Sequence, residues 1–298
     1  MSVSVPTPAI PTGDDLTPTP FADIDARRQL LSADCSKCVA LCCVALSFTH
    51  SSDFAINKAA GEPCENLDEN FGCGIHARLM RSGFRGCTVF DCFGAGQQVT
   101  QETFAGANWR DTPSIRPAMF EVFPIVRQLN ELRFYLSEAL ALPLDRVLRA
   151  ETESRYQHLT DLSASDAATL RALDLSVERS PVAELLGRIS AAIRANGVQR
   201  SRSLPARVRA GADLMGAILR GKDLSYASLR GAYLIGADLS GCDLSFTDLI
   251  GADLRDADLS GADLSTALFV TQPQLNSARG SAATLLPAGL SRPAQWSD

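Results

Sequence analysis

Leucine recurs every five residues over a long stretch near the C-terminal end of this 298-residue chain. A five-residue step suits neither regular structure, because such leucines would spiral around every face of an α-helix and alternate between the two faces of a strand. A chain that turns a corner every five residues keeps them on one side. Four corners would close a square coil, and stacked coils would bury ladders of identical residues. The series consists of Leu214, Leu219, Leu224, Leu229, Leu234, Leu239, Leu244, Leu249, Leu254, Leu259 and Leu264, and Phe269 takes the next place.

Small residues stand two positions before most of these leucines, namely Ala212, Ala217, Ala227, Ala232, Ala237, Ala252, Ala257, Ala262 and Ala267. This unit resembles the pentapeptide-repeat family, in which the small and central residues point into a right-handed quadrilateral β-helix. The resemblance implies about three coils over residues 211–270. Lys222, Cys242 and Thr247 depart from the pattern. Cys242 suits a small buried position, whereas Lys222 predicts either a distorted first coil or an ammonium that reaches the open end.

The repeat holds nine Asp against four Lys or Arg, and it has no His and no Glu. It therefore offers an acidic surface without a catalytic constellation, and we expect an interaction platform for a protein partner that the sequence does not identify. Some members of the family mimic DNA and protect type II topoisomerases. Three coils would rise only about 14 Å, the length of about four base pairs. This short rise argues against mimicry of a duplex. DNA-mimicking topoisomerase protection is therefore only an alternative, and nucleic acid itself is not the expected partner.

Eight of the nine cysteines fall within one short region, at Cys35, Cys38, Cys42, Cys43, Cys64, Cys73, Cys87 and Cys92. Thiolates two residues apart can bind one soft metal ion, because a short turn brings both sulfurs to one point. Eight thiolates suit two four-cysteine zinc sites, or one iron–sulfur cluster with spare redox-active thiols. A disulfide framework is the other interpretation. The N-terminal segment has no apolar core of a secretory signal, so we expect a reducing cytoplasm, where disulfides do not persist.

The stretches "CSKCVALCC", "PCENL" and "GCGIHARLMRSGFRGCTVFDC" resemble the YkgJ-type cysteine-cluster family, described as chelating zinc or iron. Three residues separate Cys38 from Cys42, where the resemblance leads us to expect two, so the division of ligands between sites stays open. His76 is either a ninth ligand or a hydrogen-bonding neighbour of the site. "FGAGQQ" after Cys92 is interpreted as a tight turn that brings backbone N–H groups to the sulfurs. Asp34 and Asp91 are expected to act as caps.

The chain carries a net charge of −6, which argues against a general nucleic-acid or membrane-surface binder. No stretch approaches the roughly 20 apolar residues of a membrane span.

The helical region is expected to begin at Pro117. One face of its first helix is predicted to hold Phe120, Phe123, Val126, Leu129, Leu132, Leu136 and Leu140, with Pro124 near the start of that helix. The last helix of the region is expected to end at Asn196-Gly197. We expect a disordered leader at 1–24, a cysteine-cluster metal-binding domain at 25–112, a helical region at 113–200, a basic linker at 201–210, the repeat at 211–270 and a capping tail at 271–298, with Phe269, Leu285, Leu286 and Trp296 in the cap.

The sequence thus predicts an α+β multidomain protein that binds zinc or iron through its eight cysteines and acts as an adaptor through the β-helix surface. We expect the metal to be mainly structural, because closed all-sulfur shells leave no open coordination position. The alternative from a different class is an iron–sulfur redox or modifying protein. The residues themselves show no catalytic constellation.

Overall fold

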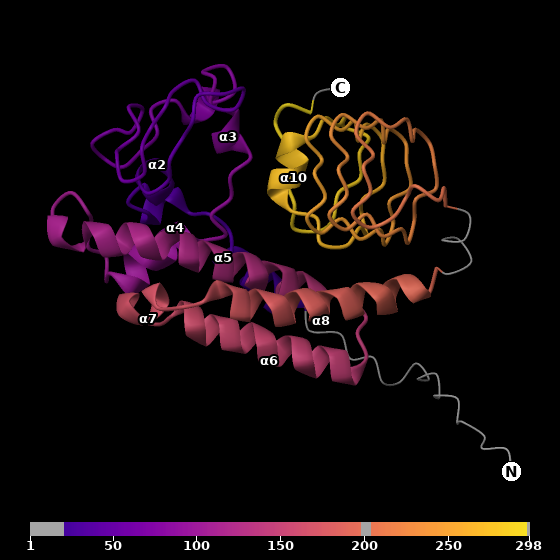
Figure 1. Ribbon diagram of the computed structural model, residues 1–298, viewed down its shortest axis with the longest axis horizontal. Helices are drawn as coiled ribbons and strands as arrows, with labels where there is room; N and C mark the ends of the chain where they lie inside the picture. Colours follow the sequence, from indigo (N-terminus) through magenta and orange to yellow (C-terminus); the bar gives the residue numbers. More distant parts are fainter. Residues whose placement is uncertain (1–20, 198–203, 297–298) are drawn as a thin grey trace, which may run out of the picture.

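The computed structural model describes residues 21–197 and 204–296. Figure 1 shows the cysteine-rich region and the five-residue repeat side by side, both lying against a layer of helices. The expected leader lies outside the described residues up to position 20, and the expected linker does so up to position 203. In the described part of the chain, no helix has the length and apolar character needed to cross a membrane.

The helical layer consists of α5 (Arg116–Leu140), α6 (Arg146–Ser163), α7 (Ala167–Arg171) and α8 (Leu175–Ala195). The apolar face predicted for α5 is confirmed, since Phe123, Val126, Leu129, Leu136 and Leu140 are buried and Phe120 and Leu132 are partly buried. The other three helices begin after Asp145, Asp166 and Asp174. Each of these carboxylates accepts a backbone N–H from the first turn, which explains where the helices start.

Pro124 does not lie near the start of its helix as predicted. The helix begins at Arg116 and places Pro117 in its first turn, so that Pro124 stands in the interior. A proline there removes one helix hydrogen bond. The helix continues through this point because Phe123 and Val126 are fully buried on either side of it.

The predicted C-terminus at Asn196-Gly197 is confirmed, because α8 ends at Ala195 with Asn196 as its cap. Glycine is needed at the next position for a reason that the sequence does not show. A Cβ on Gly197 would lie 2.0 Å from the ring of Tyr226 in the repeat. The end of α8 therefore packs directly against the first coil.

Short helices separated by irregular segments make up the cysteine-rich region. They are α1 (Phe21–Leu30), η1 (Cys35–Lys37), α2 (Leu41–Val44), η2 (His76–Arg78), α3 (Arg85–Thr88), α4 (Ala95–Gln98), η3 (Val99–Thr103) and η4 (Pro113–Ile115). Residues 21–24 of the expected leader belong to α1 rather than to a disordered segment. They are ordered because Ile24 is buried and because Arg27 and Arg28 of the same helix pair with Glu153 and Glu138 of the helical layer.

Successive turns of the repeat are 20 residues apart, which is four units of five. Parallel bridges join residues at this offset, for example Asp213 with Tyr233 and Ile218 with Asp238. The central leucines are buried in one continuous cluster, as predicted. No extended strand forms in the described part of the repeat, in contrast to the strands expected of a β-helix, and the bridges are isolated. A corner every five residues leaves only one bridging residue on each side of the coil.

The three departures from the repeat pattern have separate explanations. Lys222 is exposed while its backbone keeps the regular hydrogen bonds, so the ammonium reaches solvent and the coil is not distorted. Cys242 is buried as expected, with its thiol 3.0 Å from the carbonyl of Leu219. Thr247 is also buried, and its hydroxyl donates to the carbonyl of Leu224 at 2.7 Å. Each polar group therefore reaches water or a carbonyl of the coil below.

The pattern changes at Phe269. The five-residue spacing predicts that Phe269 fills the next central position of the coil. Its ring packs instead against Tyr135 of α5, with 6.3 Å between ring centroids, and its backbone has a φ of +61°. The chain leaves the coil here because α10 (Gln272–Ser277) follows at once. Beyond this helix, Arg279 and Leu285 bridge the last coil. Of the other residues expected in a cap, Trp296 is buried on the solenoid cluster, Leu286 is partly buried there, and Leu285 is exposed.

Candidate metal centre

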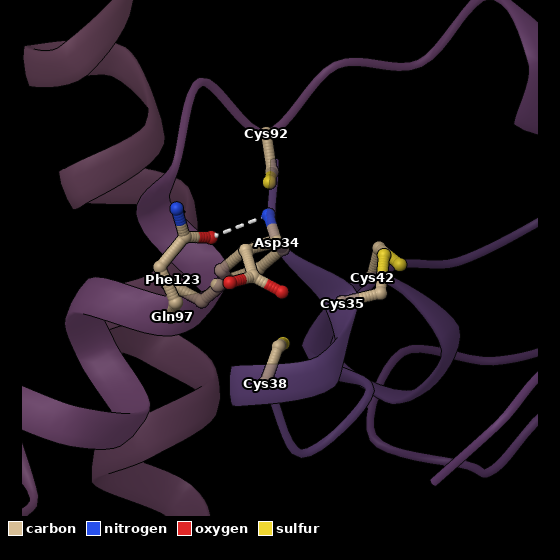
Figure 2. A pocket seen from close by; sticks show the side chains of 8 residues that line it. Asp34, Cys35, Cys38, Cys42, Cys92, Gln97 and Phe123 are labelled. Carbon is tan, nitrogen blue, oxygen red and sulfur yellow. Dashed lines mark hydrogen bonds between the residues drawn. The ribbon is translucent and has the colours of Figure 1, made fainter. Parts of the chain in front are cut away.

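Four of the cysteines surround one small cavity, and we call Cys35, Cys38, Cys42 and Cys92 the first thiol group. Cys35 opens η1, Cys38 follows that helix, Cys42 lies in α2, and Cys92 precedes α4. Figure 2 shows their side chains at the cavity together with Asp34, Gln97 and Phe123. The cavity has a volume of about 20 Å³. That is room for a single water-sized particle.

The backbone around the first thiol group is held by hydrogen bonds from α4. The side-chain oxygen of Gln97 accepts from the backbone N–H of Asp34 at 3.0 Å, and its amide donates to the carbonyl of Ser32 at 2.7 Å. Gly96 lies so close that a Cβ there would be 2.7 Å from the sulfur of Cys38. Asp34 caps η1 as predicted, by accepting from the backbone N–H of Ser36.

The other four cysteines, Cys43, Cys64, Cys73 and Cys87, form the second thiol group. They pack around a small apolar cluster that contains Phe48, Ile75, Leu79 and Phe84. The backbone N–H of Cys64 donates to the carbonyl of Cys43 at 3.0 Å, and Cys73 lies in a bridge with Leu67. Cys87 enters from α3. Residues distant in sequence are thus gathered by loops, not by one regular element.

The two thiol groups meet at neighbouring residues. The sulfurs of Cys42 and Cys43 are 3.9 Å apart, although each belongs to a different group. The dipeptide therefore sets the distance between the two groups, which explains why two cysteines stand next to each other in α2.

Six of the eight thiols are held in an environment that disfavours their charged form. Burial raises the pKa of Cys38 to about 12 and that of Cys92 to about 11. Burial also raises the pKa of Cys87 to about 12, with smaller contributions from neighbouring thiols. The backbone N–H groups of Gly94 and Gly96 hydrogen-bond Cys92 and oppose this shift, in the way predicted for the glycine turn. In the absence of a cation these thiols are neutral at pH 7 and weak nucleophiles.

Lys58 is a residue of this region that the sequence analysis missed. It is 6% exposed, and its ammonium donates to the carbonyls of Val44, Ala59 and Glu62 at 3.3, 3.0 and 2.9 Å. Burial lowers its pKa, and the neighbouring Cys64 and Cys43 oppose that effect. A buried cation thus stands beside the second thiol group. No motif surrounds this lysine in the sequence, so only the fold could reveal it.

As the side chains stand, no group of three or more His, Cys, Asp or Glu residues in 21–197 and 204–296 is arranged to hold a metal ion. All nine cysteines are free thiols. His76 is exposed in η2, His50 is exposed, and His158 pairs with Glu178 on the helical layer. The structure therefore brings the eight predicted cysteines into two sets of four without closing either set.

A model of the pentapeptide repeats family matches eight copies within residues 210–245 and 227–265. Uncharacterized protein YybG of Bacillus subtilis (strain 168) is 48% identical over 266 residues, which covers 89% of this chain and 95% of that protein. The aligned length exceeds the 60 residues of the repeat, so the similarity includes much of the cysteine-rich and helical regions.

Solved structures of pentapeptide repeat proteins are similar to parts of the chain. The pentapeptide repeat protein Rfr23 from the cyanobacterium Cyanothece 51142 is 33% identical, with 26% of this chain and 52% of that chain covered and a TM-score of 0.24. A pentapeptide repeat protein from the thylakoid lumen of Arabidopsis thaliana is 29% identical, with 30% and 55% covered and a TM-score of 0.21. The match spans about half the length of these two proteins. From the repeat and the extended similarity to YybG, the chain belongs to the same family as that protein and is a pentapeptide-repeat protein.

Proposed function

We propose that the protein binds zinc or iron through its two thiol groups and acts in the cytoplasm as an adaptor that presents a protein-binding surface on its repeat. One observation carries the metal proposal: Cys92 joins Cys35, Cys38 and Cys42, more than 45 residues away in the sequence, around a single cavity of about 20 Å³. Unrelated cysteines have no reason to converge in this way. The resemblance of the cysteine spacing to the YkgJ-type family supports the same proposal.

The residues present fit a soft metal ion. Four sulfur donors are the set that zinc and iron–sulfur clusters prefer. The backbone N–H groups beside Cys92 suit a negatively charged sulfur, and the Lys58 ammonium beside the second thiol group would offset part of the negative charge of four thiolates. When bound, the metal would link the loops of this region. Four-sulfur shells leave no coordination position for a substrate, so the role we propose is structural.

The repeat supports an adaptor role through its surface. Bridges between residues four units apart support a quadrilateral β-helix, and the right-handed sense is the one that the family resemblance implies. Exposed aspartates of the repeat include Asp213, Asp223 and Asp256, and no His or Glu occurs in the repeat. Such a solenoid offers an extended surface for a partner protein and no chemistry of its own. Its short rise argues against mimicry of a DNA duplex.

An iron–sulfur redox role is the second candidate. Cys35 of the first thiol group is exposed, so this group has access to solvent, whereas Cys64 of the second group is buried. The 3.9 Å contact between the two groups would also place two metal centres close together. Solvent exposure is one of the factors that set the reduction potential of an iron–sulfur cluster.

The test is elemental analysis and a visible spectrum of full-length protein purified without oxygen. We expect two zinc ions per chain and a colourless solution. Iron with acid-labile sulfide and visible absorbance would favour the redox candidate instead. Cys38→Ser and Cys87→Ser should each remove the metal of one group only. Cys242→Ala is the matched control, because alanine is the usual residue at that repeat position and this cysteine lies outside both groups. Metal-free wild-type protein would refute metal binding, and an equal loss in the control would refute the assignment of the metal to the two thiol groups.

A further inference from the structure

A second and much larger cavity lies where the three regions meet, with a volume of about 330 Å³. Its walls come from α1, from the segment between Cys87 and α4, from α5 and from the tail that follows the repeat. Cavities of this size are typical of small-molecule sites, and they are common at domain interfaces. The thiol groups do not line this cavity, so the inference drawn from it does not rest on metal binding.

Aromatic rings form much of the apolar wall. Phe90, Phe93 and Phe134 line the cavity, together with Leu31 and Leu290. The rings of Phe93 and Phe134 contact each other, with 5.4 Å between centroids. The guanidinium of Arg127 already lies 5.3 Å from the ring centroid of Phe90. Arg127 also lies 5.7 Å from the ring centroid of Phe93, so these two rings already attract a positive charge, whereas the ring of Phe134 has no such partner among the residues that the structure describes.

Asp91 supplies the polar group that has an unused acceptor. One carboxylate oxygen accepts from the backbone N–H of Phe93 at 2.8 Å. Among the residues that the structure describes, the other oxygen accepts no hydrogen bond. A carboxylate oxygen that lines a cavity without a protein donor is suited to receive a donor from a ligand.

The charges around the cavity sum to a negative value. Arg28 is bound by Glu138 through two hydrogen bonds of 2.7 and 2.8 Å and also pairs with Asp25. Arg127 pairs with Glu131 and donates to the backbone carbonyl of Asp91, not to its carboxylate. The charged residues that line the cavity are Arg28, Asp91 and Glu138, which sum to a net charge of −1.

We propose that this cavity is a binding site for a small organic cation, a primary amine or guanidinium attached to an apolar body. The cationic head hydrogen-bonds the free oxygen of Asp91. The apolar body lies against the phenylalanine rings. Because the walls belong to the cysteine-rich region, α5 and the tail together, the bound molecule contacts all three.

Isothermal titration calorimetry on the full-length protein tests the proposal with three probes of equal length: hexylamine, hexanol and hexanoate. Hexylamine should bind saturably, with hexanol at least tenfold weaker and hexanoate without measurable binding. Asp91→Asn keeps the acceptor for Phe93 and removes the charge, so it should weaken hexylamine binding at least tenfold. Asp161→Asn, the same change on the exposed surface of α6, is the control and should bind as the wild type does.

A second variant keeps the proposal testable if Asp91→Asn disturbs the neighbouring Cys92. Ala288 is exposed at the rim of the cavity and touches neither thiol group, so Ala288→Trp should block entry while metal content and melting temperature stay at wild-type values. Loss of hexylamine binding in this variant supports the site. Absence of hexylamine binding to wild-type protein, equal binding of hexanoate, or full affinity in Ala288→Trp would overturn the proposal.

Discussion

Gly96 illustrates how a single residue positions a thiol. It lies in α4 with ordinary helical geometry, so its backbone could accept a side chain. The surrounding space leaves no room for that side chain, because a Cβ on Gly96 would lie 2.7 Å from the sulfur and 3.3 Å from the Cβ of Cys38. The glycine is therefore needed for the close approach of α4 to the first thiol group, whereas the neighbouring Gly94 is needed for its φ of +75°.

Substituting Gly96→Ala should destabilise the protein and weaken metal retention at the first thiol group. The clash with Cys38 should cost about 1–3 kcal/mol of unfolding free energy. Gly187→Ala in α8 is the matched control, because nothing lies within 4 Å of its added Cβ. That variant should gain about 0.5–1 kcal/mol from helix propensity alone. Chemical denaturation measures both changes, and equal stabilisation in the two variants would contradict the proposed contact.

At the scale of the element, the five-residue unit is held by a recurring turn. In eight units the aspartate before the central leucine accepts a hydrogen bond from the backbone N–H two residues later, for example Asp238 from Ser240 and Asp253 from Arg255. The side-chain hydrogen bond from Ser240 lowers the pKa of Asp238, and that from Arg255 lowers the pKa of Asp253. The aspartates thus stabilise corners as well as making the surface acidic.

The repeat should consequently lose stability in acid. A carboxyl whose pKa is lowered in the folded state stabilises above its unfolded pKa of about 3.9, and this contribution disappears as the pH falls through the folded pKa. Thermal unfolding followed by circular dichroism should show a melting temperature that is level from pH 8 to 5 and falls below about pH 4.

The double variant Asp238→Asn, Asp253→Asn keeps the turn acceptors without the charge, so its melting temperature should fall less steeply with acid than that of the wild type. An unchanged slope would show that these two carboxylates do not contribute.

At the scale of the whole molecule, the two thiol groups differ in how they are anchored. Cys38, Cys42 and Cys92 of the first pack against the largest buried cluster. This cluster joins Val39 and Leu41 to the inner face of α5 and to Leu268 and Phe269 at the end of the repeat. The second packs on a separate cluster with only five buried members. Leu46 and Leu67 connect it to the largest cluster, and its other contacts include Arg85 with Asp256 at 2.8 Å and Asn276 with the carbonyl of Thr88 at 2.7 Å. The second group therefore depends more on bound metal.

Chelation should loosen residues 46–87 before any other part of the described chain. A small cluster without its metal link has too little apolar burial to order its loops. We expect trypsin to cut at Arg78 or Arg81 at least tenfold faster after treatment with a chelator, while residues 211–270 stay protected, as read by mass spectrometry. Re-added zinc should restore protection. Protection of 46–87 in protein shown to be metal-free would exclude a structural role for the metal.

Local patterns in the sequence determined the periodic parts of this protein. The inward leucines of the repeat and the buried face of α5 could be predicted, because the burial of each residue there follows from its spacing from neighbours a few positions away. Cap residues such as Asp34 and Asn196 follow the same rule. The cysteine density also marked the candidate site, since thiols so concentrated point to shared chemistry.

Only the tertiary structure decided how these parts combine. The division of eight cysteines into two groups, the buried Lys58 and the turn of Phe269 toward Tyr135 depend on contacts between segments far apart in the chain. Pro124 lies in a helix interior because packing on α5 outweighs its local preference. The cavity at Asp91 exists only where three regions meet. Such features follow from the path of irregular loops and from competition for burial, which no short-range period in the amino-acid sequence encodes.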